Sequence, residues 1–226
     1  SLPDYKTVAQ LAPFGEGPDE FNDIRMIPTE ETDKLCYVWS IRNNRIFSLS
    51  TTLKLEEYDR LTEVPENKIL PSDPLYMGNG KMQVSLGSND GMGIGLVSLN
   101  DTIVKGTVPF LFAEGAGWFF YIGNLAHSFS RKREAFAFTF HDRIVFFDFD
   151  GNHVKMCRFG DKTLQTTSSP DNPLYYYSCF ASDKYVYAVY RESKKDTDET
   201  NPLYLEQFDW DGNPVARYLL PKGRGL

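Results

Sequence analysis

Two stretches of the sequence share a pattern that decides the fold. Residues 144–159 read IVFFDFDGNHVKMCRF, and residues 205–220 read LEQFDWDGNPVARYLL. Both contain Phe, Asp, an aromatic residue, Asp, Gly and Asn in that order, with apolar residues on either side. Because Gly and Asn readily adopt the positive φ angles that a tight turn requires, each stretch predicts a β-hairpin.

Weaker copies of the hairpin precede these two, in residues 94–108 (IGLVSLNDTIVKGTV) and 45–60 (RIFSLSTTLKLEEYDR). The expected turns lie near residues 51, 101, 150 and 211, so they are separated by 50, 49 and 61 residues. We attribute the longer last interval to a charged insertion, residues 191–202. A period of ~50 residues that holds four short strands is typical of a β-propeller blade.

Two further strand-like runs lie upstream of each hairpin, which gives every unit four strands. The run AFAFTF alternates and places Phe136, Phe138 and Phe140 on one face, and YVYAVY alternates in the same way. No window shows the 3.6-residue periodicity of a helix. The expected inner pairs of strands are 21–27 with 34–40, 75–77 with 81–86, 118–125 with 134–140, and 174–181 with 184–190.

The sequence therefore predicts an all-β chain that forms a single β-propeller domain over residues 1–226. The four complete four-stranded blades are expected over about residues 21–62, 74–109, 117–160 and 174–220. Residues 5–14 are expected to form the outermost strand of a preceding blade.

Two motifs carry a resemblance to a known family. The segment FGEGPDEFNDI (14–24) resembles the Phe-Gly-x-Gly-Pro-x-Glu-Phe junction between blades of six-bladed propellers of the NHL-like and TolB-like kind. FDWDGNPVARYLL (208–220) resembles the penultimate-blade hairpin of the TolB-like six-bladed β-propeller family. The resemblance implies six blades, so that about one blade lies beyond each end of this chain. It also implies a bacterial secreted lipoprotein, with a periplasmic or cell-surface location and a lipid anchor in the full-length protein. It supplies no catalytic residues.

Composition narrows the class of function. The 226 residues carry a net charge of −7, which disfavours nucleic-acid binding because such binding rests on cationic contacts to phosphate. Aromatic residues make up 15% of the chain and exclude disorder. The sequence contains no signal peptide and no run of ~18 apolar residues that could span a membrane.

The three cysteines, Cys36, Cys157 and Cys179, lie far apart within apolar runs. We expect them to be buried small hydrophobic residues, with a Cys157–Cys179 disulfide as the alternative. Their spacing matches no zinc site. We therefore expect no metal site and no cofactor.

Three polar groups could carry chemistry. The run from Asp148 to Asn152 resembles a calcium loop but lacks the third acidic position and the distal Glu, so a turn is the favoured interpretation. The acidic residues 16–23 could supply a carboxylate pair, but the glycines among them favour a tight loop in which Glu20 accepts backbone hydrogen bonds. His141 with Asp142 reads as a polar turn, with a catalytic role as the alternative. No Gly-x-Ser-x-Gly motif or P-loop occurs, and we expect no catalytic residues.

Ligand binding is expected along the innermost strands, which line the central channel of a propeller. The candidate ligand-binding residues at the ends of these strands are Arg25, Tyr76, Asn124, His127 and Tyr177. Two aromatic clusters, residues 118–121 and 175–177, are also of interest. About half of their rings must be core, and the others could form platforms that bind sugars or peptides.

The sequence favours a non-enzymatic binding or scaffold protein outside the cytoplasm. Its expected ligand is a carbohydrate, a peptide or an envelope protein. The alternative is a propeller hydrolase or lactonase-like enzyme with a metal on the central axis.

Overall fold

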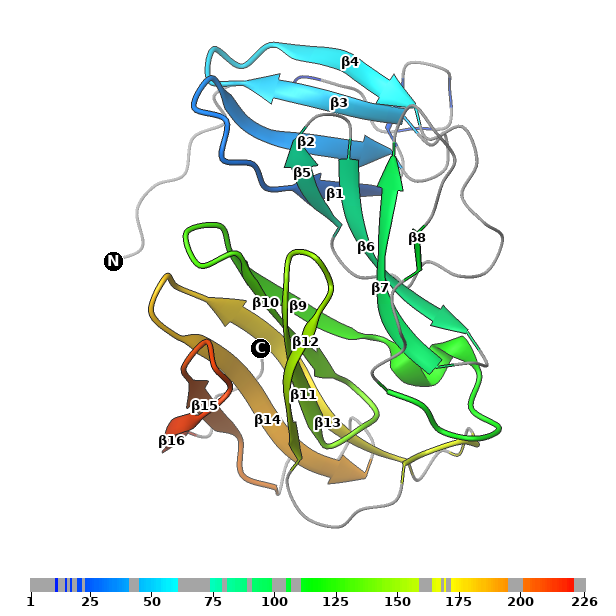
Figure 1. Cartoon of the computed structure of the whole chain (residues 1–226), viewed down its shortest axis with the longest axis vertical. Coiled ribbons are helices and arrows are strands. Elements are labelled where there is room, and N and C mark those ends of the chain that lie inside the picture. Colours follow the sequence, from blue (N-terminus) through cyan, green and yellow to red (C-terminus); the bar gives the residue numbers. More distant parts are fainter. Residues whose placement is uncertain are drawn as a thin grey trace. The chain divides into compact units, whose positions relative to one another are not determined.

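The computed structural model describes residues 11, 15, 17, 20–21, 23–40, 45–60, 74–78, 81–88, 91–98, 105–106, 111–158, 164–167, 169, 172–194 and 201–221. The described residues form four antiparallel sheets of four strands each and one short 3-10 helix (Figure 1). In every sheet, neighbouring strands follow one another in sequence. The predicted all-β class and the four four-stranded sheets are confirmed.

The strands of each sheet have the following bounds. The first sheet contains β1 (Ile24–Ile27), β2 (Lys34–Ser40), β3 (Arg45–Ser50) and β4 (Leu55–Arg60). The second contains β5 (Leu75–Gly78), β6 (Lys81–Ser88), β7 (Gly91–Ser98) and β8 (Lys105–Gly106). The third contains β9 (Gly123–Ser128), β10 (Arg133–Phe138), β11 (Arg143–Asp148) and β12 (His153–Arg158). The fourth contains β13 (Pro173–Ala181), β14 (Val186–Lys194), β15 (Tyr204–Phe208) and β16 (Pro214–Leu219).

The chain divides into two compact units. The first contains β1–β5, residues 81–83 of β6 and residues 97–98 of β7. The second contains residues 84–88 of β6, residues 91–96 of β7, and β8–β16.

The duplicated sequence forms two hairpins with the same hydrogen bonds. Asp148 Oδ1 accepts from the backbone N–H groups of residues 150 and 152 at 3.0 and 2.8 Å, and its Oδ2 accepts from the Asn152 amide at 3.0 Å. Asp209 repeats the pattern with residues 211 and 213 at 3.0 and 2.8 Å, and with the Asn213 amide at 2.9 Å. The glycine of each turn has a positive φ, 81° and 75° respectively. The turn interpretation of these runs is therefore confirmed.

One predicted strand is wrong at its start. Residues 118–125 were expected to be extended, but Trp118–Tyr121 forms the 3-10 helix η1, and β9 begins only at Gly123. Tyr121 closes this segment, because its hydroxyl accepts from the Ala113 N–H at 3.1 Å and lies 3.4 Å from the Ala113 carbonyl oxygen. Aromatic side chains favour strands only as a weak tendency, which this local closure overrides.

Smaller differences concern strand ends. The innermost strand expected over residues 21–27 begins only at Ile24. β14 begins at Val186, two residues later than expected, because residues 182–185 form the turn from β13. It continues to Lys194, so the expected insertion at 191–202 begins within a strand. The expected outer strand at 5–14, apart from Leu11, and the expected turn near residue 101 lie outside the described residues.

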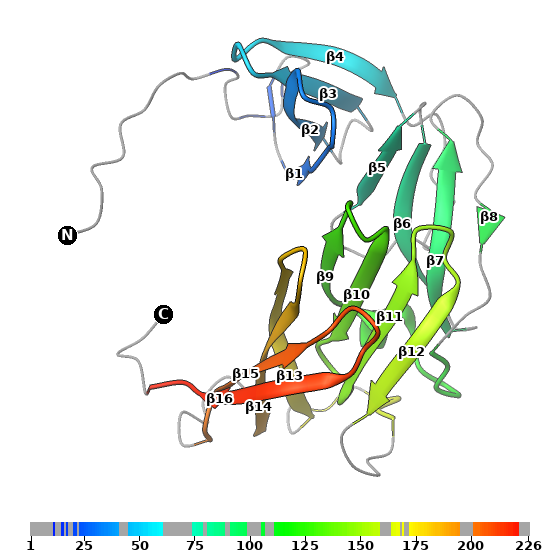
Figure 2. The same cartoon turned by 60° about the vertical axis from the view of Figure 1, so that its left-hand side comes forward.

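The third sheet is buried on both faces. One face packs against the fourth sheet. Its buried side chains come from all four strands, at every second position along β10 and β11: Ala126, Ala135, Ala137, Ile144, Phe146 and Cys157. The other face packs against β7 and η1 and includes Phe136, Phe138, Val145 and Phe147. Figure 2 shows the third and fourth sheets as neighbours within the second unit. The expected alternation of Phe136 and Phe138 onto one face is confirmed.

In the first unit, Cys36, Val38 and Phe47 form the buried centre of one face of the first sheet. All three cysteines of the chain are buried and free, as expected, so the alternative disulfide does not form. Burial raises the pKa of each thiol, and that of Cys179 reaches about 12. Within the described part of the chain, no helix is long and apolar enough to cross a membrane.

Candidate functional site

Two exposed aromatic side chains lie side by side on η1. Trp118 is 46% exposed and Phe119 is 42% exposed, and their ring centroids are 6.1 Å apart with nearly perpendicular planes. The next two residues, Phe120 and Tyr121, are buried. The expectation that half of this aromatic cluster is core therefore holds. We call Trp118, Phe119 and the half-buried Phe140 the aromatic platform.

Ring contacts fix the platform to the third sheet. The Phe119 and Phe140 centroids are 4.9 Å apart, and the Phe120 and Phe140 centroids are 5.8 Å apart. Phe140 lies in the turn between β10 and β11, and its carbonyl oxygen accepts a hydrogen bond from Gln165 Nε2. Because η1 and the turn hold one another, the two exposed rings are presented in a fixed geometry.

His141 lies next to the platform and is buried. Its ring is 6.1 Å from that of Tyr121 and 5.8 Å from that of Phe138, between centroids. Burial, reinforced by the nearby Arg143 cation, lowers the pKa of His141 to about 4, and the backbone of Phe120 opposes this shift. The imidazole is thus neutral at pH 7 and behaves as a core side chain.

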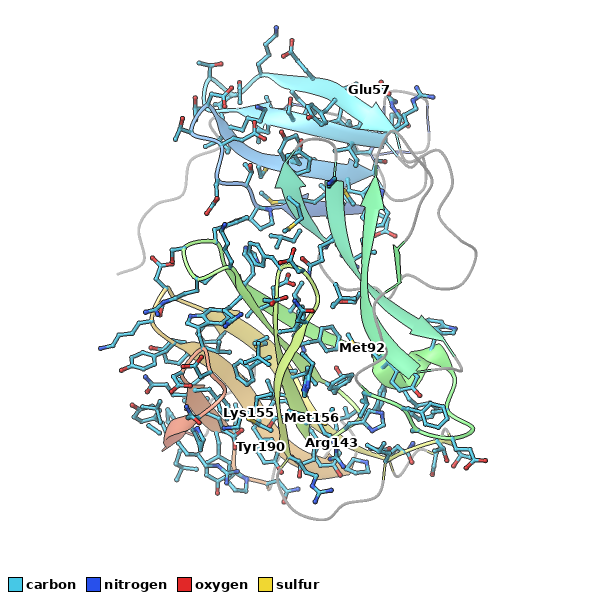
Figure 3. All side chains as sticks on the ribbon, viewed as in Figure 1. Glu57, Met92, Arg143, Lys155, Met156 and Tyr190 are labelled. Atoms are coloured by element: carbon cyan, nitrogen blue, oxygen red, sulfur yellow. The ribbon has the colours of Figure 1, made fainter. Side chains whose placement is uncertain are left out.

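Asp142 and Arg143 are also buried, and the charge of Asp142 acts on two side chains of the fourth sheet. Arg143, labelled in Figure 3, donates from Nη1 to the Asp142 carbonyl oxygen at 3.1 Å. Burial lowers the pKa of the Arg143 guanidinium. Burial raises the pKa values of Tyr176 and Glu206, and the charge of the nearby Asp142 adds a smaller contribution in the same direction.

Tyr176 and Glu206 form a buried hydrogen bond within the fourth sheet. The Tyr176 hydroxyl donates to Glu206 Oε2 at 3.2 Å, and Glu206 Oε1 lies 3.3 Å from Arg217 Nε. Burial raises the pKa of Glu206, while Arg217 and Tyr176 oppose this shift. Burial also raises the pKa of Tyr176 well above its usual value. Tyr176 and Glu206 are almost fully shielded from solvent, while the Arg217 side chain is 48% exposed, so this cluster is part of the packed sheet and not an open site.

Two of the five residues predicted to bind ligand belong to the first unit. Arg25 lies on β1 opposite Trp39 and is half-buried. Tyr76 lies on β5 and is 4% exposed. Its hydroxyl is 2.7 Å from that of Tyr58, and its ring centroid is 4.2 Å from that of Tyr37. Tyr76 therefore belongs to a packed group of tyrosines.

Those tyrosines are anchored by a carboxylate. The Tyr37 hydroxyl donates to Glu31 Oε1 at 2.7 Å, and Glu31 also forms an ion pair with Lys34. Burial, and then the Glu31 hydrogen bond, raises the pKa of Tyr37. The hydrogen bond with Tyr76 contributes most to raising the pKa of Tyr58 to about 12. The Tyr37 and Tyr58 phenols therefore stay protonated at neutral pH, and Tyr37 donates its hydrogen bond to Glu31.

The other three predicted residues belong to the second unit. Asn124 and His127 are both half-buried on β9, but they are three positions apart and thus point to opposite faces of the sheet. His127 lies directly across from the buried Glu134 on β10, and its ring centroid is 5.1 Å from that of Phe129. Tyr177, on β13, is 39% exposed, and Arg191 lies 5.8 Å above its ring. The second unit therefore does not gather these three side chains at one point.

Sequence reasoning missed two polar links. Asp183 Oδ1, in the turn between β13 and β14, accepts from Ser128 Oγ at 3.1 Å and from Ser130 Oγ at 2.8 Å. The second link involves Glu206, which lies between Tyr204 and Phe208 on the side of β15 that faces the third sheet. A charged residue at such an inward-facing strand position was the sequence signal that could have revealed the link. The expected backbone hydrogen bond to Glu20 is confirmed, since the Gly17 N–H donates to Glu20 Oε2 at 2.7 Å.

No family model matches this sequence, and no curated protein does. Solved structures do. A member of the DUF4221 family from Bacteroides vulgatus is similar with a TM-score of 0.62 and 12% identity, over 95% of this chain and 71% of the other. A protein from Bacteroides fragilis, named as a candidate exported protein, is similar with a TM-score of 0.56 and 11% identity, over 95% and 62% respectively.

These neighbours are six-bladed β-propellers. The chain forms four blades of that type. At such low identity the similarity shows the fold alone. In the part of the chain that the structure describes, no three His, Cys, Asp or Glu side chains are grouped so that they could hold a metal ion.

Proposed function

We propose that this protein is a non-enzymatic binding protein whose ligand contacts the aromatic platform. The observation that carries the proposal is the pair of adjacent rings, Trp118 and Phe119, of which 46% and 42% remain exposed on a segment held rigid by Tyr121 and Phe140. Neighbouring exposed aromatic rings on a fixed scaffold are typical of recognition surfaces, because a ligand that covers them removes apolar area from water.

The platform suits a carbohydrate or a peptide. The faces of Trp and Phe rings pack against the C–H surfaces of sugars and against aliphatic side chains. The net charge of −7 argues against a polyanionic ligand. An envelope protein that presents such a peptide segment belongs to the same class of ligand.

The location outside the cytoplasm, the lipid anchor and the finer TolB-like or NHL-like assignment are part of this proposal. The similar Bacteroides fragilis protein is named as a candidate exported protein, which supports the location. Cell fractionation of the natural gene product, with mass spectrometry of its N-terminus, tests it. A product found only in the cytoplasm would contradict the proposed location.

The five residues predicted along the inner strands form a second, separate proposal for ligand contact. Asn124, His127 and Tyr177 retain exposed surface, while Tyr76 is almost fully packed. The alternative of a hydrolase or lactonase-like enzyme with an axial metal stays a prediction, and no group of described residues adds support to it.

The test begins with glycan and peptide arrays, followed by calorimetric titration of the best binder. Trp118→Ala and Phe119→Ala are each expected to weaken binding at least tenfold, about 1.4 kcal/mol, because each removes one face of the platform. The control Phe180→Ala removes a ring of similar exposure (48%) from the fourth sheet and should leave the affinity unchanged.

The same titration separates the two proposed contact regions. Binding that His127→Ala weakens and Trp118→Ala leaves intact would overturn the platform and favour the inner strands. Substrate turnover by the wild-type protein would overturn the non-enzymatic assignment.

A further inference from the structure

The aromatic platform begins in the connection between the second and third sheets, within the second unit. Short-range hydrogen bonds fix this connection. The Ala116 N–H donates to the Ala113 carbonyl oxygen at 3.0 Å, and the Phe120 N–H donates to that of Gly117 at 3.1 Å. Since the Tyr121 hydroxyl also holds Ala113, the turn before η1 and η1 itself form one closed loop.

One carboxylate belongs to this loop. Glu114 lies in the turn before η1, four residues ahead of Trp118, and is exposed. Among the described residues it forms no ion pair. The chain between Glu114 and Trp118 reads Gly-Ala-Gly, and a Cβ atom placed at Gly115 or Gly117 would have no atom beyond its chain neighbours within 4 Å. The space beside this backbone is therefore open to a ligand.

Elsewhere in the second unit, cations of the chain itself cover exposed aromatic rings. The Arg217 guanidinium lies 3.8 Å from the ring centroid of Tyr204. Arg191 lies 5.8 Å from that of Tyr177, a side chain that is 39% exposed. Such contacts are attractive because the face of an aromatic ring carries partial negative charge.

The aromatic platform differs in this respect. In the part of the chain that the structure describes, no cation lies over a ring of the platform. The indole of Trp118 contacts the Phe119 ring at an interplanar angle of 84°, and an edge-to-face contact covers at most one face of the indole. Indole is the aromatic group that attracts cations most strongly. The loop thus combines an uncovered indole face with the full negative charge of Glu114.

We propose that the ligand of the aromatic platform is a peptide segment whose arginine side chain stacks on Trp118 and pairs with Glu114. This inference rests on the proposed function and selects one of its ligand classes. A guanidinium suits both contacts, because its flat face stacks on an aromatic ring while its N–H groups donate to a carboxylate. The net charge of −7 adds attraction for a basic segment.

A matched pair of peptides tests the role of the cation. One is a short peptide of Gly and Ser with a central arginine and blocked ends. The other carries citrulline at the same position, which keeps the shape of the side chain and removes its charge. NMR titration of the protein's amide signals, which detects even weak binding, measures both affinities. The citrulline peptide is expected to bind about fivefold more weakly, because it loses both the cation–ring attraction and the ion pair.

Two variants test the residues. Trp118→Ala and Glu114→Gln should each weaken binding of the arginine peptide about fivefold, and Glu114→Gln should leave the citrulline peptide unaffected. Glu30→Gln is the matched control, since it makes the same change in net charge at an exposed position of the first unit. It should leave both affinities unchanged.

Three results would overturn the inference: no binding of the arginine peptide, equal affinity of the two peptides, or equal losses from Glu114→Gln and Glu30→Gln. The array experiment then separates this failure from that of the proposed function. If a glycan or an uncharged peptide binds in a way that Trp118→Ala weakens, the proposed function stands and only the choice of a cationic peptide is wrong. If Trp118→Ala weakens the binding of no ligand, both are wrong.

Discussion

The third and fourth sheets have the same strand number and the same hairpin motif, yet they differ in burial. In the third, five of the six residues of β10 and five of the six of β11 are buried. In the fourth, burial alternates along β14, where Val186 and Ala188 are fully buried and their neighbours are half-buried. The comparison shows that a sheet enclosed on both sides sorts its side chains by size, since Ala135 and Ala137 face one neighbour and Phe136 and Phe138 the other. The fourth sheet does not sort them by polarity, since Phe180 and Tyr218 are 48% and 49% exposed while Glu206 is buried.

The largest expected difference concerns matched phenylalanines. Phe146, on β11, is 0% exposed, and its ring lies 5.9 Å from that of Phe208. Phe146→Ala should lower the free energy of unfolding by about 3–5 kcal/mol, because it leaves a cavity at the contact between the sheets. Phe180→Ala, at a side chain of the fourth sheet that is 48% exposed, should lower it by less than about 1 kcal/mol in urea denaturation. Equal losses for the two variants would show that the Phe180 ring is packed as tightly as that of Phe146.

The second prediction concerns pH. Above pH 6.5, His141 is neutral in both the folded and the unfolded chain, so it contributes no pH dependence. As the pH falls from 6.5 to about 4, the unfolded chain binds a proton that the buried imidazole does not. The free energy of unfolding therefore falls by about 3 kcal/mol over this window, which corresponds to the lowered pKa.

Urea denaturation at a series of pH values checks this effect. His141→Gln should remove that part of the pH dependence, so the difference between variant and wild type changes by about 3 kcal/mol between pH 6.5 and 4. His153→Gln is the control, because it makes the same substitution at an exposed position of the same sheet. A His141→Gln curve parallel to that of the wild type would show that the imidazole is hydrated.

The smallest expected effect compares two tyrosines of the fourth sheet. The Tyr176 hydroxyl donates to the buried Glu206 carboxylate, while the Tyr218 hydroxyl donates to Gln207 Oε1 at 2.9 Å on the other side of the sheet. Tyr176→Phe should lower the free energy of unfolding by about 1–3 kcal/mol, because Glu206 loses a donor without access to water. Tyr218→Phe should change it by less, since the Tyr218 side chain is 49% exposed and Gln207 is not charged. Thermal or urea denaturation of both variants makes the comparison, and a larger loss for Tyr218→Phe would reverse the assignment of the two faces.

Much of the fold could be predicted because its signals are local. The strand at Lys34–Ser40 was predicted to the residue, and the hairpins around Gly151 and Gly212 follow from side-chain hydrogen bonds within a few positions. The error at Trp118–Tyr121 arose because four successive aromatic residues carry strand propensity but no alternation. The contact that decides this segment, between Tyr121 and Ala113, spans eight residues and leaves no periodic trace.

The candidate site was harder to predict from sequence. Which half of the Trp118–Tyr121 cluster is exposed depends on the contact of Phe119 and Phe120 with Phe140, in a turn about twenty residues later. The burial of His141 depends on η1 lying against the same turn. Sequence patterns report the faces of single strands, and they do not report how loops from two sheets pack together.

The two Asp-Gly hairpins have a consequence for how such a chain can evolve. Every hydrogen bond made by the Asp148 and Asp209 carboxylates ends within four residues of its origin. A gene segment that encodes one sheet thus encodes every residue whose hydrogen bonds to the Asp carboxylate form the outer turn, wherever unequal recombination inserts that segment. Copies can then diverge in their core and loop residues while the turn keeps the register of the two outer strands. The number of four-stranded sheets can therefore change without the evolution of a new turn.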